Sequence, residues 1–101
     1  MKINQTMVVG EILRDEMIAD AIRKFVVKNH INKGLELIFV RNIVYVGIKF
    51  TLAKFGFDNV KALFVGLLTG VCERDSAIRF ARVIYSITNT YMVEHCIQGG
   101  I

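Results

Sequence analysis

The sequence predicts an all-α fold: one domain over residues 1–101, with about four helices and a central apolar helical hairpin. Apolar residues recur at intervals of three and four along most of the chain, as on the buried face of a helix. The chain contains no proline, and short segments rich in Gly, Asn and Asp separate the periodic stretches. The expected helices span residues 10–30, 35–56, 59–72 and 75–97.

The first expected helix, residues 10–30, follows a short arm or first strand formed by residues 1–9. Its apolar positions have helical spacing, and charged residues occupy much of the opposite side: Glu11, Arg14, Asp15, Arg23 and Lys24. This pattern is typical of an amphipathic helix. Residues 29–34 have the composition of a helix end, and Gly34 is expected to provide a left-handed cap.

The second expected helix, residues 35–56, has two interpretations over residues 37–52. Ten of those 16 residues are β-branched or aromatic, which is compatible with two strands turning at Arg41 and Asn42. We favour a helix, because that turn lacks the glycine that two-residue hairpins prefer. A helix would carry two narrow polar stripes, one made of Arg41, Asn42, Tyr45 and Lys49, and the other of Glu36, Gly47 and Lys54.

Two further breaks define the remaining helices. Gly56 is expected to end the second helix, and Asp58 is expected to cap the third, over residues 59–72. Asp75 or Ser76 is the expected N-cap of the fourth helix, over residues 75–97. Apolar residues then continue at helical spacing toward the end of the chain.

Residues 35–72 form an almost unbroken apolar block, with 24 hydrophobic and 6 charged residues among 38. The charges are scattered singly, so no uncharged run exceeds the 11 residues from 62 to 72. A membrane span needs roughly 20 apolar residues, which makes a small membrane-associated protein only the third hypothesis. One short chain can hardly bury this block alone, and large exposed apolar patches usually mark interfaces. We therefore expect a structural subunit that assembles with other copies of itself into a filament, pilus-like tube or shell.

Small residues recur at every fourth position in the third expected helix, at Ala62, Gly66 and Gly70. Such a line of small side chains lets another helix backbone approach closely. Glycine in a helix interior costs about 1 kcal/mol relative to alanine, so two of them need a reason. We expect a helix-packing interface here; the alternative is that they relieve crowding within one chain.

The segment IKFTLAKFGFDNVKALFVGLLTG places Lys54 and Lys61 on either side of a tight turn between two apolar helices. Over residues 35–72 this hairpin resembles the pilins of conjugation-type (type IV secretion) systems, whose subunits stack into hollow pili and can bind phospholipid. The resemblance implies that Lys49, Lys54 and Lys61 contact lipid headgroups or line a lumen. This chain differs in having an amphipathic helix before the hairpin and another after it.

Nucleic-acid binding is the alternative from another class, including a virion subunit that wraps nucleic acid. The net charge is +4, and Arg74, Arg79 and Arg82 are the expected phosphate contacts. The basic residues are spread out, however, and no recognition-helix pattern is evident.

We expect neither an enzyme nor a small-molecule substrate, because the sequence contains no metal-ligand spacing, catalytic pair or phosphate loop. His30, His95, Cys72 and Cys96 are isolated from further ligands, so we expect no metal and no cofactor apart from bound phospholipid. Residues 1–16 lack the apolar core of a secretory signal peptide. An assembled extracellular or virion structure and a cytoplasmic location both stay open.

Overall fold

Five α-helices make up the described part of the chain. The structure is a computed structural model that describes the backbone of residues 3–99 and the side chains of residues 3–94. The helices are α1 (Gln5–Leu13), α2 (Glu16–Lys28), α3 (Lys33–Leu52), α4 (Phe57–Leu67) and α5 (Arg74–Gly99). The all-α prediction is confirmed, and the strand alternative for residues 37–52 is wrong, because they lie within α3.

The expected helix over residues 10–30 is in fact divided between α1 and α2. Asp15 is the N-cap of α2, and its Oδ1 accepts a hydrogen bond from the backbone N–H of Ile18 at 3.2 Å. The prediction of an arm or strand over residues 1–9 is also wrong, because α1 begins at Gln5. Asn4 caps that helix by accepting from the N–H of Met7 at 3.1 Å.

The turn between α2 and α3 uses other residues than expected. His30 takes the left-handed conformation, with a φ of 53°. Asn32 caps α3 by accepting from the N–H of Leu35 at 2.9 Å. Gly34 therefore lies in the first turn of α3 and is not the left-handed cap.

The turns around α4 also differ from the predicted caps. Lys54 has a φ of 62° just after α3, and Gly56, at 82°, is the N-cap of α4. Asp58 lies in the first turn of α4, so it is not the cap. Helix α4 ends at Leu67 and α5 begins at Arg74. The predicted ends at residues 56 and 72 are therefore too late, and Asp75 and Ser76 lie inside the first turn of α5.

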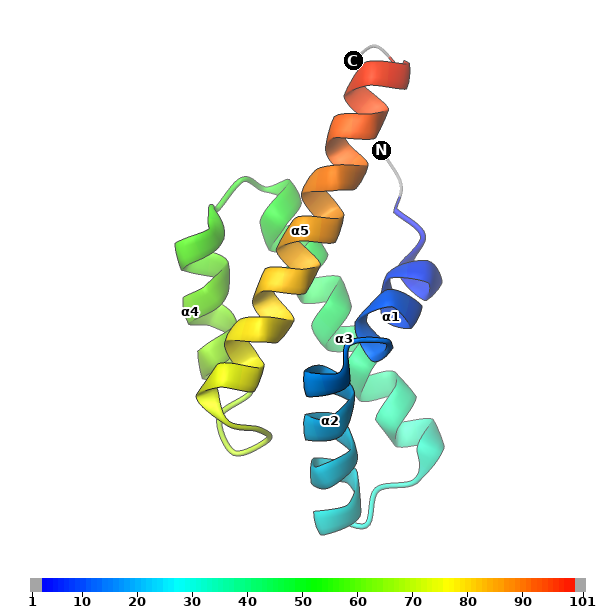
Figure 1. The fold of residues 1–101 in the computed structure, drawn as a ribbon, viewed down its shortest axis with the longest axis vertical. Coiled ribbons are helices and arrows are strands. Elements are labelled where there is room, and N and C mark those ends of the chain that lie inside the picture. The colour runs from blue at the N-terminus through cyan, green and yellow to red at the C-terminus, as the bar shows by residue number, and fades with distance from the viewer. Residues whose placement is uncertain (1–2, 100–101) are drawn as a thin grey trace.

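Helix α5 organises the bundle. It packs against all four other helices, and Figure 1 shows it crossing the molecule with α4 on one side and α1 and α2 on the other. Helices α3 and α4 each contact α5 more extensively than they contact each other, so the expected central hairpin is not confirmed. One core contains the buried apolar residues Val8, Val9, Ile12, Ile18, Ile22, Val40, Ile43, Val44, Ile48, Val60, Phe64, Leu68, Ala77, Phe80, Ala81 and Ile84.

Three helices meet most closely at Gly47 of α3. A Cβ atom built there would lie 2.8 Å from Cζ of Phe64 in α4 and 2.8 Å from Cγ2 of Ile84 in α5. Real Cβ atoms do not approach other atoms so closely, because interiors are packed to van der Waals contact. The absence of a side chain at Gly47 therefore lets α3, α4 and α5 share one centre.

Candidate interaction surface

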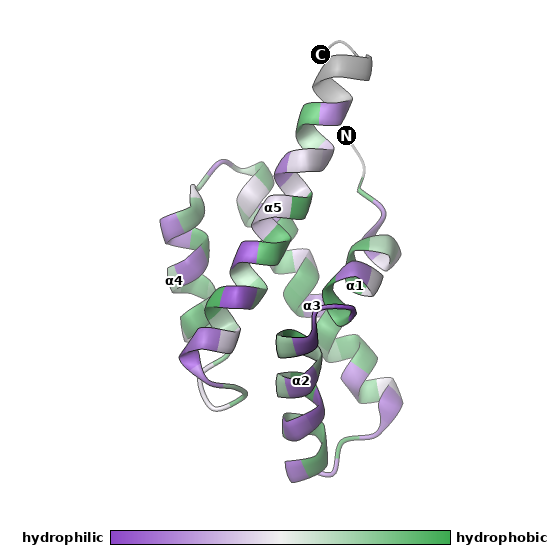
Figure 2. Cartoon of the chain, in the orientation of Figure 1, coloured by the Kyte–Doolittle hydropathy of each residue, from purple (hydrophilic) through white to green (hydrophobic). Residues whose placement is uncertain are grey.

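The first turns of α3 extend beyond the core and expose apolar side chains. The buried residues of α3 begin at Val40, whereas Leu35, Leu37 and Ile38 are 55%, 48% and 54% exposed. Leu13 of α1 and Tyr45 of α3 are also exposed. We call this set the α3 surface: Leu13, Leu35, Leu37, Ile38 and Tyr45. Figure 2 shows mainly hydrophobic colour along α3 and hydrophilic colour along much of α2.

Two shallow grooves hollow this region. One, of about 260 Å³, is lined by Leu13, Lys33, Glu36, Leu37 and Val40. The other, of about 190 Å³, is lined by Gln5, Ile38, Arg41, Asn42 and Tyr45. Apolar groups thus lie beside side chains of both charges, an arrangement that suits contact with another protein surface better than contact with lipid alone.

One of the two polar stripes expected on α3 is present. Arg41, Asn42, Tyr45 and Lys49 are all exposed, and the Nζ of Lys49 lies 4.7 Å from the ring centroid of Tyr45. The prediction of the second stripe is wrong, because Gly47 is buried where α3 meets α4 and α5. Lys54 lies beyond the end of α3.

The small residues of α4 do not form the continuous line that was expected. Ala62 and Gly66 are exposed within α4, and a Cβ at Gly66 would have nothing within 4 Å. Gly70 follows the helix, with a φ of 84°, so its role is that of a turn residue. The close approach of helices within the chain occurs at Gly47 instead.

The three lysines expected at lipid or a lumen have different surroundings. Lys49 covers Tyr45 on α3, and Lys54 occupies the left-handed turn after that helix. Lys61 lies on α4, with its Nζ 5.9 Å from the ring centroid of Phe57. The three lysines therefore differ in the contacts that they make.

The three arginines that are expected to contact nucleic acid also differ in their surroundings. Arg79 is held by Asp15, because its Nε and Nη2 both lie 2.7 Å from Oδ2 of that carboxylate. Arg82 lies over Phe57 of α4, with Cζ 5.1 Å from the ring centroid. Arg74 is exposed at the start of α5. The pairing of Arg79 removes one of the three from a phosphate-binding set.

Asp15 joins the start of α2 to α5 through a carboxylate that is mostly buried. Burial acts to raise its pKa, but the hydrogen bond from Arg79, the backbone N–H of Ile18 and the charge of Arg79 outweigh it, so the pKa lies below its ordinary value of 3.8. A lowered pKa in the folded state means that this stabilisation is complete above the unfolded pKa and is lost as the pH falls through the folded pKa.

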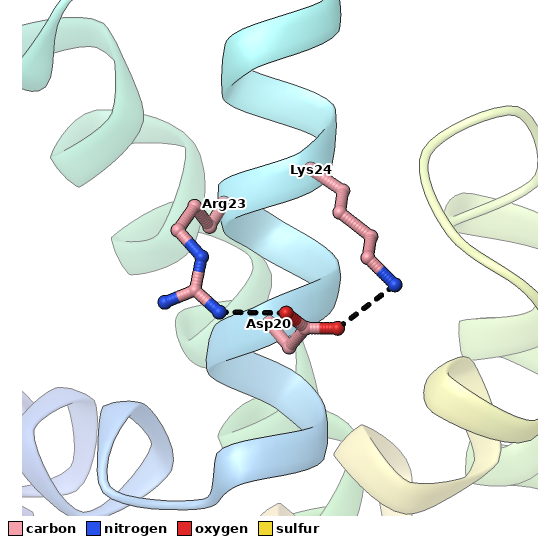
Figure 3. Close-up of polar contacts among 3 residues, drawn as sticks. All are labelled: Asp20, Arg23 and Lys24. Carbon is pink, nitrogen blue, oxygen red and sulfur yellow. Dashed lines mark hydrogen bonds and ion pairs between the residues drawn. The ribbon is translucent and has the colours of Figure 1, made fainter.

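We expect Asp15→Asn to lower the free energy of unfolding by about 1 kcal/mol near pH 7. Asparagine can still cap α2, so the loss reports mainly on the charge pair with Arg79. Urea denaturation should show the difference from the wild type shrinking toward zero as the pH falls to about 2. Asp20→Asn is the control, because the ion pairs of Asp20 are exposed (Figure 3); a control loss equal to that of Asp15→Asn would contradict the assignment.

A larger groove, of about 510 Å³, lies between α2 and the segment that joins α4 to α5. It is lined by Met17, Asp20, Ala21, Lys24, Gly70, Val71, Cys72, Glu73 and Ser76. Asp20 accepts from Lys24 and from Arg23 at its edge (Figure 3), and these hydrogen bonds lower its pKa. Burial, with a smaller contribution from Glu73, raises the pKa of the Cys72 thiol. The thiol is therefore less ionised than an ordinary cysteine and poorly suited to nucleophilic chemistry.

Among residues 3–94, no three His, Cys, Asp or Glu side chains lie close enough together to hold a metal ion. None of the helices in the described part combines the length and apolar character that crossing a bilayer requires. The side chains of His95 and Cys96 lie outside the described residues, so the prediction that both are isolated from further ligands stays a prediction.

The chain matches no family model, no curated protein and no solved structure with which it was compared. The site must therefore be judged on its own geometry. Sequence reasoning found the apolar character of residues 35–72 but not the exposed set at the start of α3. The signal was available: Leu35 and Ile38, three residues apart, lie on one side of a helix and Leu37 lies on another, and a chain of this size can cover only some of these sides.

Proposed function

We propose that this protein is a structural subunit that associates with copies of itself through the α3 surface. The observation that carries the proposal is the exposure of Leu35, Leu37 and Ile38, each close to half exposed or more, on turns of α3 that lie ahead of its first buried residue. A stable interface takes about 800 Å² from each partner. The α3 surface would form its apolar centre, and the polar residues around it would form the rim.

A second copy of the chain fits this surface because the surface carries one positive and one negative side chain, and each can pair with its opposite on the other copy. Lys33 and Glu36 line the same groove, and within residues 3–94 neither forms an ion pair with its own chain. In a two-fold pair, residue i of one copy contacts residue j of the other and the reverse. Lys33 of each copy would then face Glu36 of the other, while Leu13 and Leu37, which line the same groove, would contact the apolar residues of the partner.

A filament, pilus-like tube or shell would need a second, different contact. The outward face of Ala62 and Gly66 on α4 is our candidate, because both are exposed and no side chain of the same chain covers Gly66. Small residues at this spacing permit close helix approach. Bound phospholipid at Lys49, Lys54 or Lys61 remains part of the hypothesis based on the pilin resemblance.

We expect the purified protein to have the mass of a dimer or larger assembly in light scattering without detergent. Leu37→Glu should raise the dissociation constant at least about 100-fold, because a carboxylate would be buried at the centre of the interface. Val27→Glu is the matched control. Val27 is an apolar residue of α2 that is 68% exposed, and it lies on the face of α2 opposite the buried Ile18 and Ile22.

A monomeric wild-type protein at concentrations of about 100 μM would refute the proposal, since a dimer that weak lies outside the range of stable interfaces. Equal weakening by Val27→Glu would show that association depends on general surface hydrophobicity and not on the α3 surface. Circular dichroism should show unchanged helix content in both variants.

A further inference from the structure

Two cations from different helices converge on one aromatic ring. The Nζ of Lys61 lies 5.9 Å from the ring centroid of Phe57, and Cζ of Arg82 lies 5.1 Å from the same centroid. Phe57 and Lys61 belong to α4, whereas Arg82 belongs to α5. Tyr85 supports the ring from α5 in an edge-to-face contact, with centroids 5.4 Å apart. The contact between α4 and α5 therefore fixes the place of both charges.

Within residues 3–94, no carboxylate forms an ion pair with Lys61 or Arg82. The ion pairs of residues 3–94 belong to Arg14, Arg23, Lys24 and Arg79. Asp58 and Asp75, on the same two helices, make no ion pair within 4.0 Å of either cation. An aromatic ring offsets part of a cation's charge, by about 0.5–1 kcal/mol at exposed sites, but two positive charges on one ring still repel each other. The cluster lacks an anion.

We propose that Lys61 and Arg82 form a binding site for a phosphate-type oxyanion, with Phe57 as its apolar floor. A guanidinium donates two parallel hydrogen bonds to such an ion, and an ammonium adds a mobile point charge. Both donors lie within 6 Å of the same ring centroid before binding, which reduces the ordering cost. The site is distinct from the α3 surface and does not depend on self-association. It joins residues that the sequence assigned to separate hypotheses, Lys61 to lipid and Arg82 to nucleic acid.

The test is a titration of the full chain with inorganic phosphate, followed by NMR signals of the Arg82 Nε–Hε group and the Phe57 ring, at constant ionic strength set with chloride. We expect saturable shifts at both positions. Lys61→Gln and Arg82→Gln should each weaken phosphate binding about tenfold or more. Lys28→Gln, which removes the same charge from an exposed position on α2, should change the affinity by less than about twofold.

Shifts that do not saturate, or that chloride reproduces at equal ionic strength, would overturn the site. Equal weakening by Lys28→Gln would also overturn it, because the ion would then respond only to net charge. A second arm identifies the source of the phosphate group. Vesicles of phosphatidylglycerol that bind the wild type but neither Lys61→Gln nor Arg82→Gln, with phosphatidylcholine vesicles unbound, would assign the site to lipid headgroups. Phosphate binding without vesicle binding would assign it to a free ion or a soluble phosphate ester.

Discussion

Phe64→Ala is expected to lower the free energy of unfolding by about 3–5 kcal/mol, as truncation of a fully buried phenylalanine does. Phe64 is 0% exposed, contacts Phe80 of α5 at a ring-centroid distance of 5.5 Å, and reaches the backbone of α3 at Gly47. Its ring therefore joins α3, α4 and α5, three of the helices that form the core. The free energy of unfolding of a typical domain is only about 5–15 kcal/mol, so this variant should be largely unfolded near 50 °C.

Urea denaturation followed by circular dichroism measures this loss. Phe55→Ala is the control, because Phe55 is 50% exposed and contacts only the neighbouring Phe50 ring among the aromatic residues described. We expect its loss to stay below about 1 kcal/mol. If the two alanine variants were equally stable, Phe64 would not be the centre of the core.

Gly47→Ala should lower the free energy of unfolding, whereas Gly66→Ala should raise it. Alanine normally stabilises a helix interior by about 0.5–1 kcal/mol relative to glycine. At Gly66 the new methyl group meets nothing within 4 Å, so the full gain is expected. At Gly47 it would lie 2.8 Å from side-chain atoms of Phe64 and Ile84, and overpacking of this kind costs about 1–3 kcal/mol.

A double mutant separates this clash from other causes. Phe64→Leu removes the Cζ atom that a methyl group at position 47 would meet, but leaves the contact with Ile84. We expect Gly47→Ala to cost about 0.5–2 kcal/mol less in the Phe64→Leu background than in the wild type. Strict additivity of the two losses, measured by urea denaturation, would mean that the helices separate and that the Phe64 ring is not the obstacle.

The fold class was predictable because helical periodicity is a local property of the sequence. The break at Arg14 and Asp15 was missed because apolar residues continue on both sides of it. The buried positions do change phase there, since Ile12 and Ile18 are six residues apart, which does not fit one helix face. Asp15 followed by an acidic residue, Glu16, is also a common helix start, and it was treated as part of a charged face.

The packing was less predictable because the contacts are not local. Glu36 and Lys54 suggested a polar stripe through Gly47, but Glu36 lies in the first turn of α3 and Lys54 lies beyond its end, so neither belongs to its packed middle. Arg79 has its partner 64 residues away, at Asp15. The meeting of Lys61 and Arg82 on Phe57 likewise requires the packing of α4 on α5. Nothing in the spacing of these residues indicates such encounters before the fold is known.

The central place of α5 also determines when the chain can fold during synthesis. The segments that form α1 to α4 leave the ribosome first. All four of these helices pack on α5, which begins only at Arg74. Until that segment emerges, the sides of α3 and α4 that pack on α5 are uncovered, although α1 and α4 already contact α3, and the contacts with α5 must close long loops. The native state is therefore expected to form late and in one cooperative step, after a period in which the nascent chain exposes its core to chaperones and to other chains.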